Sequence, residues 1–477
     1  MNLDEFRKQG HHLVNWMADY LESLEGRRPV PDVLPDTIRR QLPATAPKAG
    51  EPFDHIMADF ERIILPGMAH WQHPGWFGYF SANSSPPSIL AEMLTATMAA
   101  QCMSWATSPA ATELEQTMMD WLRGMLGIPE GFTGVIQDTA STATLTSVLT
   151  ARDRAWERAG REARLTLYAS AEAHSSVGKA ARLAGFEDRL VRQIPTDAEY
   201  AMAPAALERA ILEDLAAGLT PACVVATVGT TSSTGVDPVA AIGRISRDHG
   251  LFLHVDAAWA GSATLLPEMR WLWNGLELAD SLVTNPHKWM LVNFDCSAYY
   301  VRDVDALLRT CRTTPEYLRT AHDAEVVNYR DWGIPLGRRF RALKLWFVLR
   351  SYGASGLQAI VREHIRLGRL FADWVDREPG FERMAPAPLG LVCFRHRPVG
   401  MTEAPDLDRH NRDLLARVNA GGRVFLTHTT LGGQYAIRMA IGQRTTEERH
   451  VRAAWEAVRA ALTPEASPAP RATPPQP

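Results

Sequence analysis

The sequence predicts an α/β fold, with a doubly wound, mostly parallel sheet and a smaller second unit, and three observations support this prediction. From about residue 110, short apolar runs rich in β-branched residues alternate with helical stretches, which is typical of parallel strands joined by helices. Near residue 395 the pattern changes to strand-like segments of a small α+β unit. A chain of 477 residues is long enough for about three such parts. The predicted strands of the sheet are 134–137 (GVIQ), 165–169 (LTLYA), 222–227 (ACVVAT), 251–255 (LFLHV) and 281–284 (SLVT).

The N-terminal part is predicted to be helical. Phe6, Val14, Met17, Leu21 and Leu24 recur at spacings of three and four with charged residues between them, which is the pattern of an amphipathic helix. Such a helix can pack on its own subunit or lie on a partner, and periodicity alone favours the first. Prolines then interrupt helix formation, and a second helical pattern runs from about residue 52 to 64.

The C-terminal part is predicted to be a small α+β unit. Residues 390–398 (GLVCFRHRP) and 422–431 (GRVFLTHTTL) have the pattern of strands, and a helix is expected from about 445 to 462. The last fifteen residues contain six prolines and are expected to be disordered. The predicted parts are residues 1–85, 86–360 and 361–462, with a tail at 463–477.

Composition argues against several classes of function. A net charge of −4 gives no reason to expect a nucleic acid or an anionic membrane as partner. The five cysteines lie far apart and form no C-x-x-C motif, which argues against a disulfide framework and fits the reducing cytoplasm. The N-terminus carries acidic residues where a signal peptide would be basic and then apolar, and no run of 18 apolar residues occurs. His70 and His73 could ligate a metal, but no nearby carboxylate completes a site, so no metal is expected.

Two of the predicted strands are followed by clusters of hydroxyl residues. After the first strand, Ala140 and Ser141 open a predicted helix whose free N–H groups and dipole favour an anion, although plain N-capping explains the same residues. After the strand at 222–227, Thr231 belongs to a hydroxyl cluster that could be an ordinary turn. Alone, each cluster is a weak indication of a phosphate site.

The next two strands end in charged groups that are rare in such places. Asp256 ends a buried strand, where a carboxylate is costly unless a cation meets it. Asn285, His287 and Lys288 follow the strand at 281–284, although lysine normally lies in solvent. Because ligands bind at the carboxyl ends of strands in an open α/β sheet, we expect these groups to meet.

Together these groups predict a pyridoxal-phosphate site. Lys288 can form a Schiff base, Asp256 can pair with a pyridinium nitrogen, and the hydroxyl-rich helix start can hold a phosphate. His174, which follows the strand at 165–169, could stack on the cofactor ring, although a lone histidine is more often an ordinary loop residue.

The motifs resemble those of the pyridoxal-phosphate-dependent aromatic L-amino-acid decarboxylases, the group II decarboxylases of fold type I. The resemblance covers nearly the whole chain and leaves out only the proline-rich tail. The matching segments are 5–7 (EFR), 65–67 (LPG), 104–106 (SWA), 173–176 (AHSS), 254–261 (HVDAAWAG), 285–289 (NPHKW), 293–297 (NFDCS) and 334–340 (IPLGRRF).

The resemblance implies a role for each matching residue. It makes Lys288 the Schiff-base lysine, Asp256 the partner of the ring nitrogen and Ala258 a contact of the ring. It implies that His174 stacks on the opposite ring face and that Thr231 lies near the ring oxygen or the substrate carboxylate. The phosphate and anchoring contacts it implies are Ala140, Ser141, Asn285 and His287.

One further position bears on the reaction. Residues 313–318 (TTPEYL) resemble the mobile loop that closes over the site in this family, and Tyr317 matches the tyrosine that protonates the carbon left after CO2 departs. Relatives with phenylalanine there tend to be aldehyde synthases, which also deaminate oxidatively. Tyr317 therefore favours simple decarboxylation, with aldehyde synthesis as the alternative.

The resemblance also implies an aromatic substrate and a homodimer whose active sites lie at the subunit interface. Trp76, Tyr79 and Phe80 match the aromatic wall of the substrate pocket, and Gln101 and Met103 match residues that reach into the partner's pocket. The helix at Phe6–Leu24 would then dock on the second copy. Tryptophan, phenylalanine, tyrosine and dopa all stay possible, and Ala82, where dopa-handling relatives have threonine, weakens the case for dopa.

Overall fold

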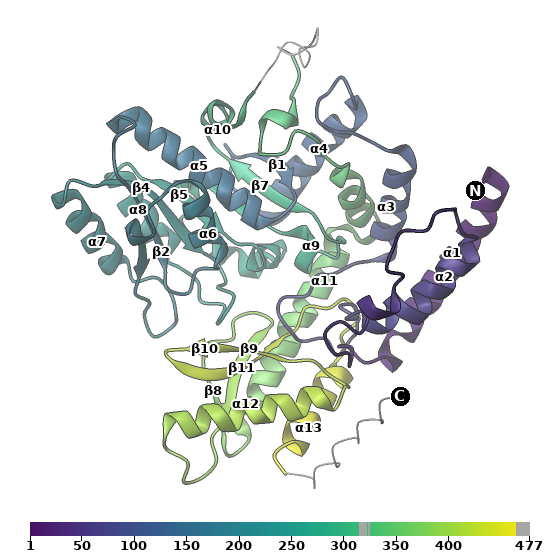
Figure 1. Ribbon diagram of the computed structural model, residues 1–477. Coiled ribbons are helices and arrows are strands. Elements are labelled where there is room, and N and C mark those ends of the chain that lie inside the picture. The colour runs from purple at the N-terminus through teal and green to yellow at the C-terminus, as the bar shows by residue number, and fades with distance from the viewer. Residues whose placement is uncertain (314–321, 323–324, 464–477) are drawn as a thin grey trace.

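The computed structural model describes residues 1–313, 322 and 325–463 (Figure 1). Its larger sheet has seven strands in the order β1-β7-β6-β5-β4-β2-β3. Only β7 runs antiparallel to its neighbours, β1 and β6, so the predicted mostly parallel sheet is confirmed. The strands are β1 (Thr133–Gln137), β2 (Leu165–Ser170), β3 (Val191–Ile194), β4 (Thr220–Thr227), β5 (Phe252–Asp256), β6 (Ser281–Thr284) and β7 (Ser297–Val301).

Helices pack against this sheet and join its strands, as doubly wound folds require (Figure 1). The connections from strand to helix are short at two strand ends: α5 begins three residues after β1, and α9 begins two residues after β6. The helices are α4 (Pro109–Leu126), α5 (Ala140–Ala159), α6 (Ser176–Leu183), α7 (Pro204–Ala216), α8 (Val239–Asp248), α9 (Pro286–Trp289) and α10 (Val304–Cys311).

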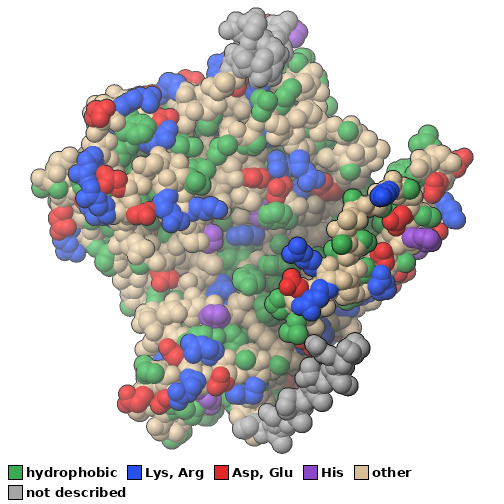
Figure 2. Space-filling model, in the orientation of Figure 1, with side chains coloured by type: hydrophobic (Ala, Val, Ile, Leu, Met, Phe, Trp, Pro, Cys, Tyr) green, Lys and Arg blue, Asp and Glu red, His purple; other side chains and the backbone are tan. Residues whose placement is uncertain are grey.

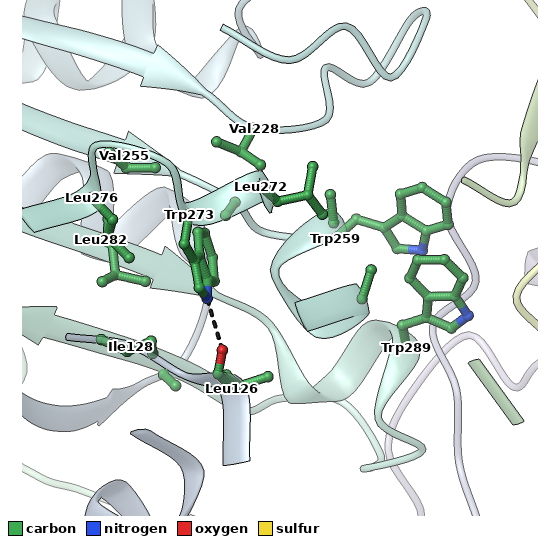
Figure 3. Packing of buried hydrophobic residues seen from close by; sticks show 14 of the residues in the cluster. Leu126, Ile128, Val228, Val255, Trp259, Leu272, Trp273, Leu276, Leu282 and Trp289 are labelled. Atoms are coloured by element: carbon green, nitrogen blue, oxygen red, sulfur yellow. Dashed lines mark hydrogen bonds between the residues drawn. The ribbon is translucent and has the colours of Figure 1, made fainter. Parts of the chain in front are cut away.

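The core of this part lies between the sheet and its covering helices. Figure 3 shows Val255 and Leu282 of neighbouring strands near Trp273, whose indole N–H donates to the Leu126 carbonyl at 2.8 Å. All four residues are buried, and the bond satisfies the one polar group of the indole. The rigid sheet that results holds the strand ends in place.

The N-terminal segment forms the expected helices. Helix α1 (Leu3–Ser23) lies beside α2 (Phe53–Asp59), which continues as a π-helix over Phe60–Ile64 (Figure 1). Helix α3 (Pro86–Met98) leads into the large sheet region. The outer sides of these helices leave several large apolar side chains exposed, namely Leu3, Phe6, Val14, Ile56, Leu90, Met93, Leu94 and Met98.

The C-terminal unit contains a four-stranded antiparallel sheet in the order β10-β11-β9-β8. The expected strands and the expected last helix are present, and helix α11 connects them to the large sheet. The boundary expected at residues 360 and 361 falls inside α11, whose one non-helical residue is Gly353. The bounds are α11 (Arg341–Arg377), β8 (Phe381–Arg383), β9 (Leu391–His396), α12 (Ala404–Ala420), β10 (Thr427–Leu431), β11 (Gln434–Ala440) and α13 (Glu448–Ala460).

The surface carries mixed charge. On the face drawn in Figure 2, acidic and basic side chains are interspersed over both units. Among the residues described, no helix combines the length and the apolar character needed to span a bilayer.

Candidate active site

A cavity of about 200 Å³ opens where the parallel strands of the large sheet end. Its walls come from the loops after β1, β2, β4, β5 and β6, so segments far apart in sequence meet there. The lining residues are Phe80, Thr139, Ala140, Ser141, His174, Ser176, Thr227, Gly229, Thr231, Asp256, Ala258, Trp259, Asn285, His287, Lys288 and Phe294.

One wall is the N-terminus of α5. The Thr139 side chain caps this twenty-residue helix by accepting a hydrogen bond from the Thr142 N–H. Ala140 and Ser141, in the first turn, face the cavity, where the positive end of the helix dipole favours an anion. Capping and anion binding are therefore compatible here, since the cap uses only one of the free N–H groups.

The opposite wall brings an amine close to a carboxylate. Asp256 is buried, and its Oδ1 accepts the Ala258 N–H at 3.0 Å. Burial lowers the pKa of Lys288, and the nearby Asp256 charge offsets part of that effect. The Lys288 Nζ lies 5.7 Å from the centre of the Phe80 ring. A lowered pKa makes more of the neutral, nucleophilic amine available.

Two histidines complete the polar wall, and both are held by their Nδ1 atoms. The Nδ1 of His174 accepts the Ser176 N–H at 3.2 Å, and the Nδ1 of His287 accepts the Cys296 N–H at 3.0 Å. Burial lowers the pKa of both rings, that of His287 to about 3. Each ring is therefore neutral near pH 7, with its remaining proton on Nε2 as a donor.

The donor set fits pyridoxal phosphate. The cavity offers a helix N-terminus for the phosphate, a carboxylate for the ring nitrogen and an amine for the aldehyde carbon. The Thr227 hydroxyl is buried at the cavity wall and has no hydrogen-bond partner among the residues that the structure describes, so a ligand can use it. Gly229 adopts φ +82°, and a Cβ there would lie 2.5 Å from the Ala260 Cβ, so only glycine fits this part of the wall.

The cavity brings together most of the residues singled out from the sequence. Ten of them line it, namely Phe80, Ala140, Ser141, His174, Thr231, Asp256, Ala258, Asn285, His287 and Lys288. Tyr317 lies outside the described residues. The roles of these residues stay predictions.

Four predicted substrate residues do not line the cavity of this chain. Trp76 is buried and packs at tilted angles against Phe425 and Trp71, whereas Tyr79 is 53% exposed. The Gln101 side chain accepts the Arg338 N–H at 2.8 Å, and the Met103 carbonyl accepts the Arg330 N–H. Within one chain, these two residues therefore form hydrogen bonds with the backbone at Arg330 and Arg338.

Six cavity residues were not chosen from the sequence: Thr139, Ser176, Thr227, Gly229, Trp259 and Phe294. Thr227 ends β4, and Trp259 follows Asp256 by three residues, so their places at strand ends were a usable signal. Phe294 comes from a loop whose path depends on tertiary packing, and no local pattern marks it.

The alternative metal site is not formed. His70 hydrogen-bonds the Tyr20 hydroxyl through Nδ1, and the Nδ1 of His73 accepts the Gly75 N–H. Within the described ranges, no group of three or more His, Cys, Asp and Glu side chains could hold a metal ion.

Comparisons with known proteins identify the family of this chain. Residues 35–397 match the model of the pyridoxal-dependent decarboxylase conserved domain. The chain is 45% identical to the aromatic-L-amino-acid decarboxylase of Sus scrofa and 44% identical to the phenylacetaldehyde synthase of Arabidopsis thaliana, covering 96% of each chain in both pairs. Its structure matches a crystal structure of Oryza sativa TDC with PLP and tryptamine at a TM-score of 0.94 and 38% identity, over 97% of this chain and 98% of that one. The chain thus belongs to the pyridoxal-dependent decarboxylase family, among the aromatic-L-amino-acid decarboxylases, and is a carboxy-lyase that uses pyridoxal phosphate.

Proposed function

We propose that this protein removes CO2 from an aromatic L-amino acid and releases the arylalkylamine, with tryptophan, phenylalanine, tyrosine and dopa as the candidate substrates. The single observation that carries the proposal is the cavity in which Lys288, Asp256 and His174 meet an aromatic wall. When bound, pyridoxal phosphate accepts the electron pair that CO2 leaves behind. Everything else in the proposal concerns the chain's own residues.

The side chains divide the work of binding and orientation. Lys288 would hold the cofactor covalently, and the Asp256 carboxylate would pair with its ring nitrogen and favour a proton there. The α5 N-terminus, with Asn285 and His287, would bind the phosphate, and Thr231 would contact the ring oxygen or the substrate carboxylate. Ala258 and His174 would contact the ring and help to orient the substrate.

The aromatic preference follows from the chemistry of the walls. Lys288 is the only lysine or arginine among the described residues that line the cavity, so a glutamate side chain would find no second cation there. Phe80, Trp259 and Phe294 offer ring faces and edges instead. Trp76 and Tyr79 extend this aromatic region outside the cavity.

We also propose that the protein works as a homodimer in the cytoplasm. The exposed apolar side chains on α1 and α3 support a surface that a second copy covers, because a monomer rarely exposes so many large apolar side chains. Gln101 and Met103 then serve the site of the partner, and α1 docks on the second copy. The five cysteines are free thiols, which suits a reducing compartment.

The second candidate is an aromatic aldehyde synthase, and one specific observation favours it: a phenylacetaldehyde synthase is 44% identical to this chain. That reaction consumes O2 and water and yields aldehyde, CO2, ammonia and hydrogen peroxide. The presence of Tyr317, as the proton donor to the α-carbon, favours the amine instead.

Product analysis tests the proposal directly. The cofactor-loaded protein is incubated with each of the four aromatic amino acids and with glutamate, and the products are identified by mass. We expect one amine per CO2 from an aromatic substrate and none from glutamate. Aldehyde and peroxide in yields that match CO2 would favour the synthase, and turnover of glutamate alone would contradict the aromatic preference.

A further inference from the structure

Three aromatic rings, those of Phe80, Trp259 and Trp289, form a nearly parallel column that runs from the cavity into the core, and the His364 ring lies beside the last of them in nearly the same plane. The Phe80 and Trp259 rings are 4.2 Å apart at 8°, and the Trp259 and Trp289 rings are 4.1 Å apart at 7°. Figure 3 shows the two indoles face to face. The His364 ring of α11 lies 6.4 Å from Trp289 at 8°. Each side chain is at least nine-tenths buried.

A hydrogen bond fixes the far end of this column. The Trp289 Nε1–H donates to the Nδ1 of His364 at 2.9 Å, and the small angle between the rings fits a bond that lies in both ring planes. His364 also hydrogen-bonds the backbone of Gln443, and burial lowers its pKa to about 4. The neutral ring therefore keeps Nδ1 free of a proton and able to accept.

The column joins the two strand ends that carry the reacting groups. Trp259 follows Ala258 directly and lies three residues after Asp256, whereas Trp289 follows Lys288 directly. Contact between the two indoles therefore limits how far α9, which carries Lys288, can move relative to the end of β5. Phe80 closes the column at the cavity, where its ring lies 5.7 Å from the Lys288 Nζ.

Ordinary core packing does not require this geometry. In the C-terminal unit, Phe371 meets Phe394 at 69° and Trp455 at 89°, which is the edge-to-face arrangement common among buried aromatic rings. The rings beside the cavity are parallel and hydrogen-bonded at their inner end instead. That arrangement resists both sliding and tilting of Trp289.

We propose that the ring column sets the position of the Lys288 amine relative to Asp256, and that His364 is a positioning residue that acts through Trp289. His364 does not line the cavity, so it touches neither the cofactor nor the substrate. The inference rests on the proposed function only in that Lys288 and Asp256 are taken as the reacting groups.

The test replaces His364 in the cofactor-loaded protein. His364→Leu removes the acceptor, and His364→Asn restores an acceptor oxygen near the position of Nδ1. We expect His364→Leu to lower kcat about tenfold to a hundredfold with little change in KM, because a shift of about 1 Å misplaces the amine. The exciton circular dichroism of the stacked indoles, assigned with Trp259→Phe, should weaken in His364→Leu and recover in His364→Asn.

A matched control separates positioning from general destabilisation. His450 is also buried and its Nδ1 also accepts one N–H at 2.9 Å, but it caps α13 in the C-terminal unit. We expect His450→Leu to leave kcat and the indole signal unchanged. Unchanged kcat or an unchanged indole signal in His364→Leu, or equal losses of kcat in both leucine variants, would overturn the inference.

The spectroscopic readouts do not depend on turnover. The indole signal and the visible circular dichroism of bound pyridoxal phosphate report the geometry even if none of the tested amino acids is a substrate. Failure of the proposed function would leave the wild-type protein without product, whereas failure of the ring-column inference would leave the His364→Leu spectra like those of the wild type.

Discussion

Two residues define the proposed reaction: Lys288, which would hold the cofactor, and Tyr317, which would protonate the α-carbon. Lys288 lies in a cavity whose burial lowers its pKa, so its amine is suited to attack a carbonyl carbon. Tyr317 is assigned through its motif alone, since it lies outside the described residues. In the proposed function, the choice between amine and aldehyde depends on that tyrosine.

Replacing Tyr317 with phenylalanine should therefore change the product. Without the phenolic O–H, the electron-rich carbon left by CO2 waits longer for a proton, and O2 can oxidise it. We expect Tyr317→Phe to make aldehyde, ammonia and hydrogen peroxide at the expense of amine, as measured by product mass and a peroxide assay. Tyr435→Phe, in the C-terminal sheet, serves as the control. Amine output equal to that of the wild type in Tyr317→Phe would remove the proposed role.

At the scale of elements, one open edge of the large sheet is closed by a buried ion pair. β1 is one of the two edge strands, and the backbone of Ile136 pairs outward with side chains instead of another strand. Glu115 of α4 accepts the Ile136 N–H at 2.8 Å, and Arg338 donates to the Ile136 carbonyl at 2.7 Å. Arg338 also binds Glu115 through two hydrogen bonds. The ion pair thus satisfies the backbone N–H and the backbone carbonyl of Ile136 at this edge.

Removing one partner of that pair should be costly. Arg338→Met leaves the Glu115 carboxylate buried without its cation, and we expect a loss of about 3–5 kcal/mol in the free energy of unfolding, measured by denaturant. Arg339→Met removes the exposed pair with Glu92 from the neighbouring position and should cost less than about 1 kcal/mol. Equal losses in the two variants would contradict the assignment.

Strand β5 should give the stability of the protein a dependence on pH. Burial between Ser147 and Ser281 lowers the pKa of His254 to about 4, whereas a histidine in an unfolded chain titrates near about 6.5. The unfolded chain therefore binds a proton that the folded chain excludes. The free energy of unfolding should fall by up to about 3 kcal/mol from this residue as the pH drops from about 6.5 to about 4.

The matched comparison uses two histidine variants. His254→Gln should flatten the decline of the free energy of unfolding between about pH 6.5 and about pH 4, because the group that titrates there is gone. His12→Gln, at an exposed position of α1, should leave the decline unchanged. An equally steep decline in His254→Gln and in the wild type would show that His254 does not carry this dependence.

Much of the fold and site follows from local sequence signals, and the remainder needs tertiary information. Five strands of the large sheet could be predicted because they are short apolar runs, and Asp256 and Lys288 because polar groups at the carboxyl ends of parallel strands converge. β7 and β3 were not predicted, and β3 is a partly exposed edge strand with polar residues. His364 has no local mark, since only folding brings α11 beside Trp289.

At the scale of the whole molecule, the proposed dimer makes a prediction about shared sites. If Met103 serves the partner's site, a chain with Lys288→Ala and a chain with Met103→Arg are each inactive alone. In a mixed dimer, one site combines the intact Lys288 of one chain with the intact Met103 of the other. Random pairing then restores about a quarter of wild-type activity, and the purified mixed dimer should have about half.

Co-expression of the two tagged chains checks this, with purification of the mixed species and an assay for product. The control pairs Lys288→Ala with Asp256→Asn, two changes within one chain's cavity, which leaves each mixed dimer no intact site and should restore no activity. An absence of recovery in the Met103 mixture, as in this control, would contradict the crossing of Met103 into the partner's site. A single-chain mass in solution for the active protein would contradict the dimer.

The proposed function depends most on Lys288, as the residue that would hold the cofactor. The chain has five lysines, Lys8, Lys48, Lys179, Lys288 and Lys344, and only Lys288 lines the cavity. Borohydride reduction of the pyridoxal-phosphate-loaded protein, followed by peptide mass mapping, locates the attachment directly. We expect the reduced cofactor on the peptide that contains Lys288 and on no other peptide. Label on a different lysine, or none at all on a protein that still releases amine, would contradict it.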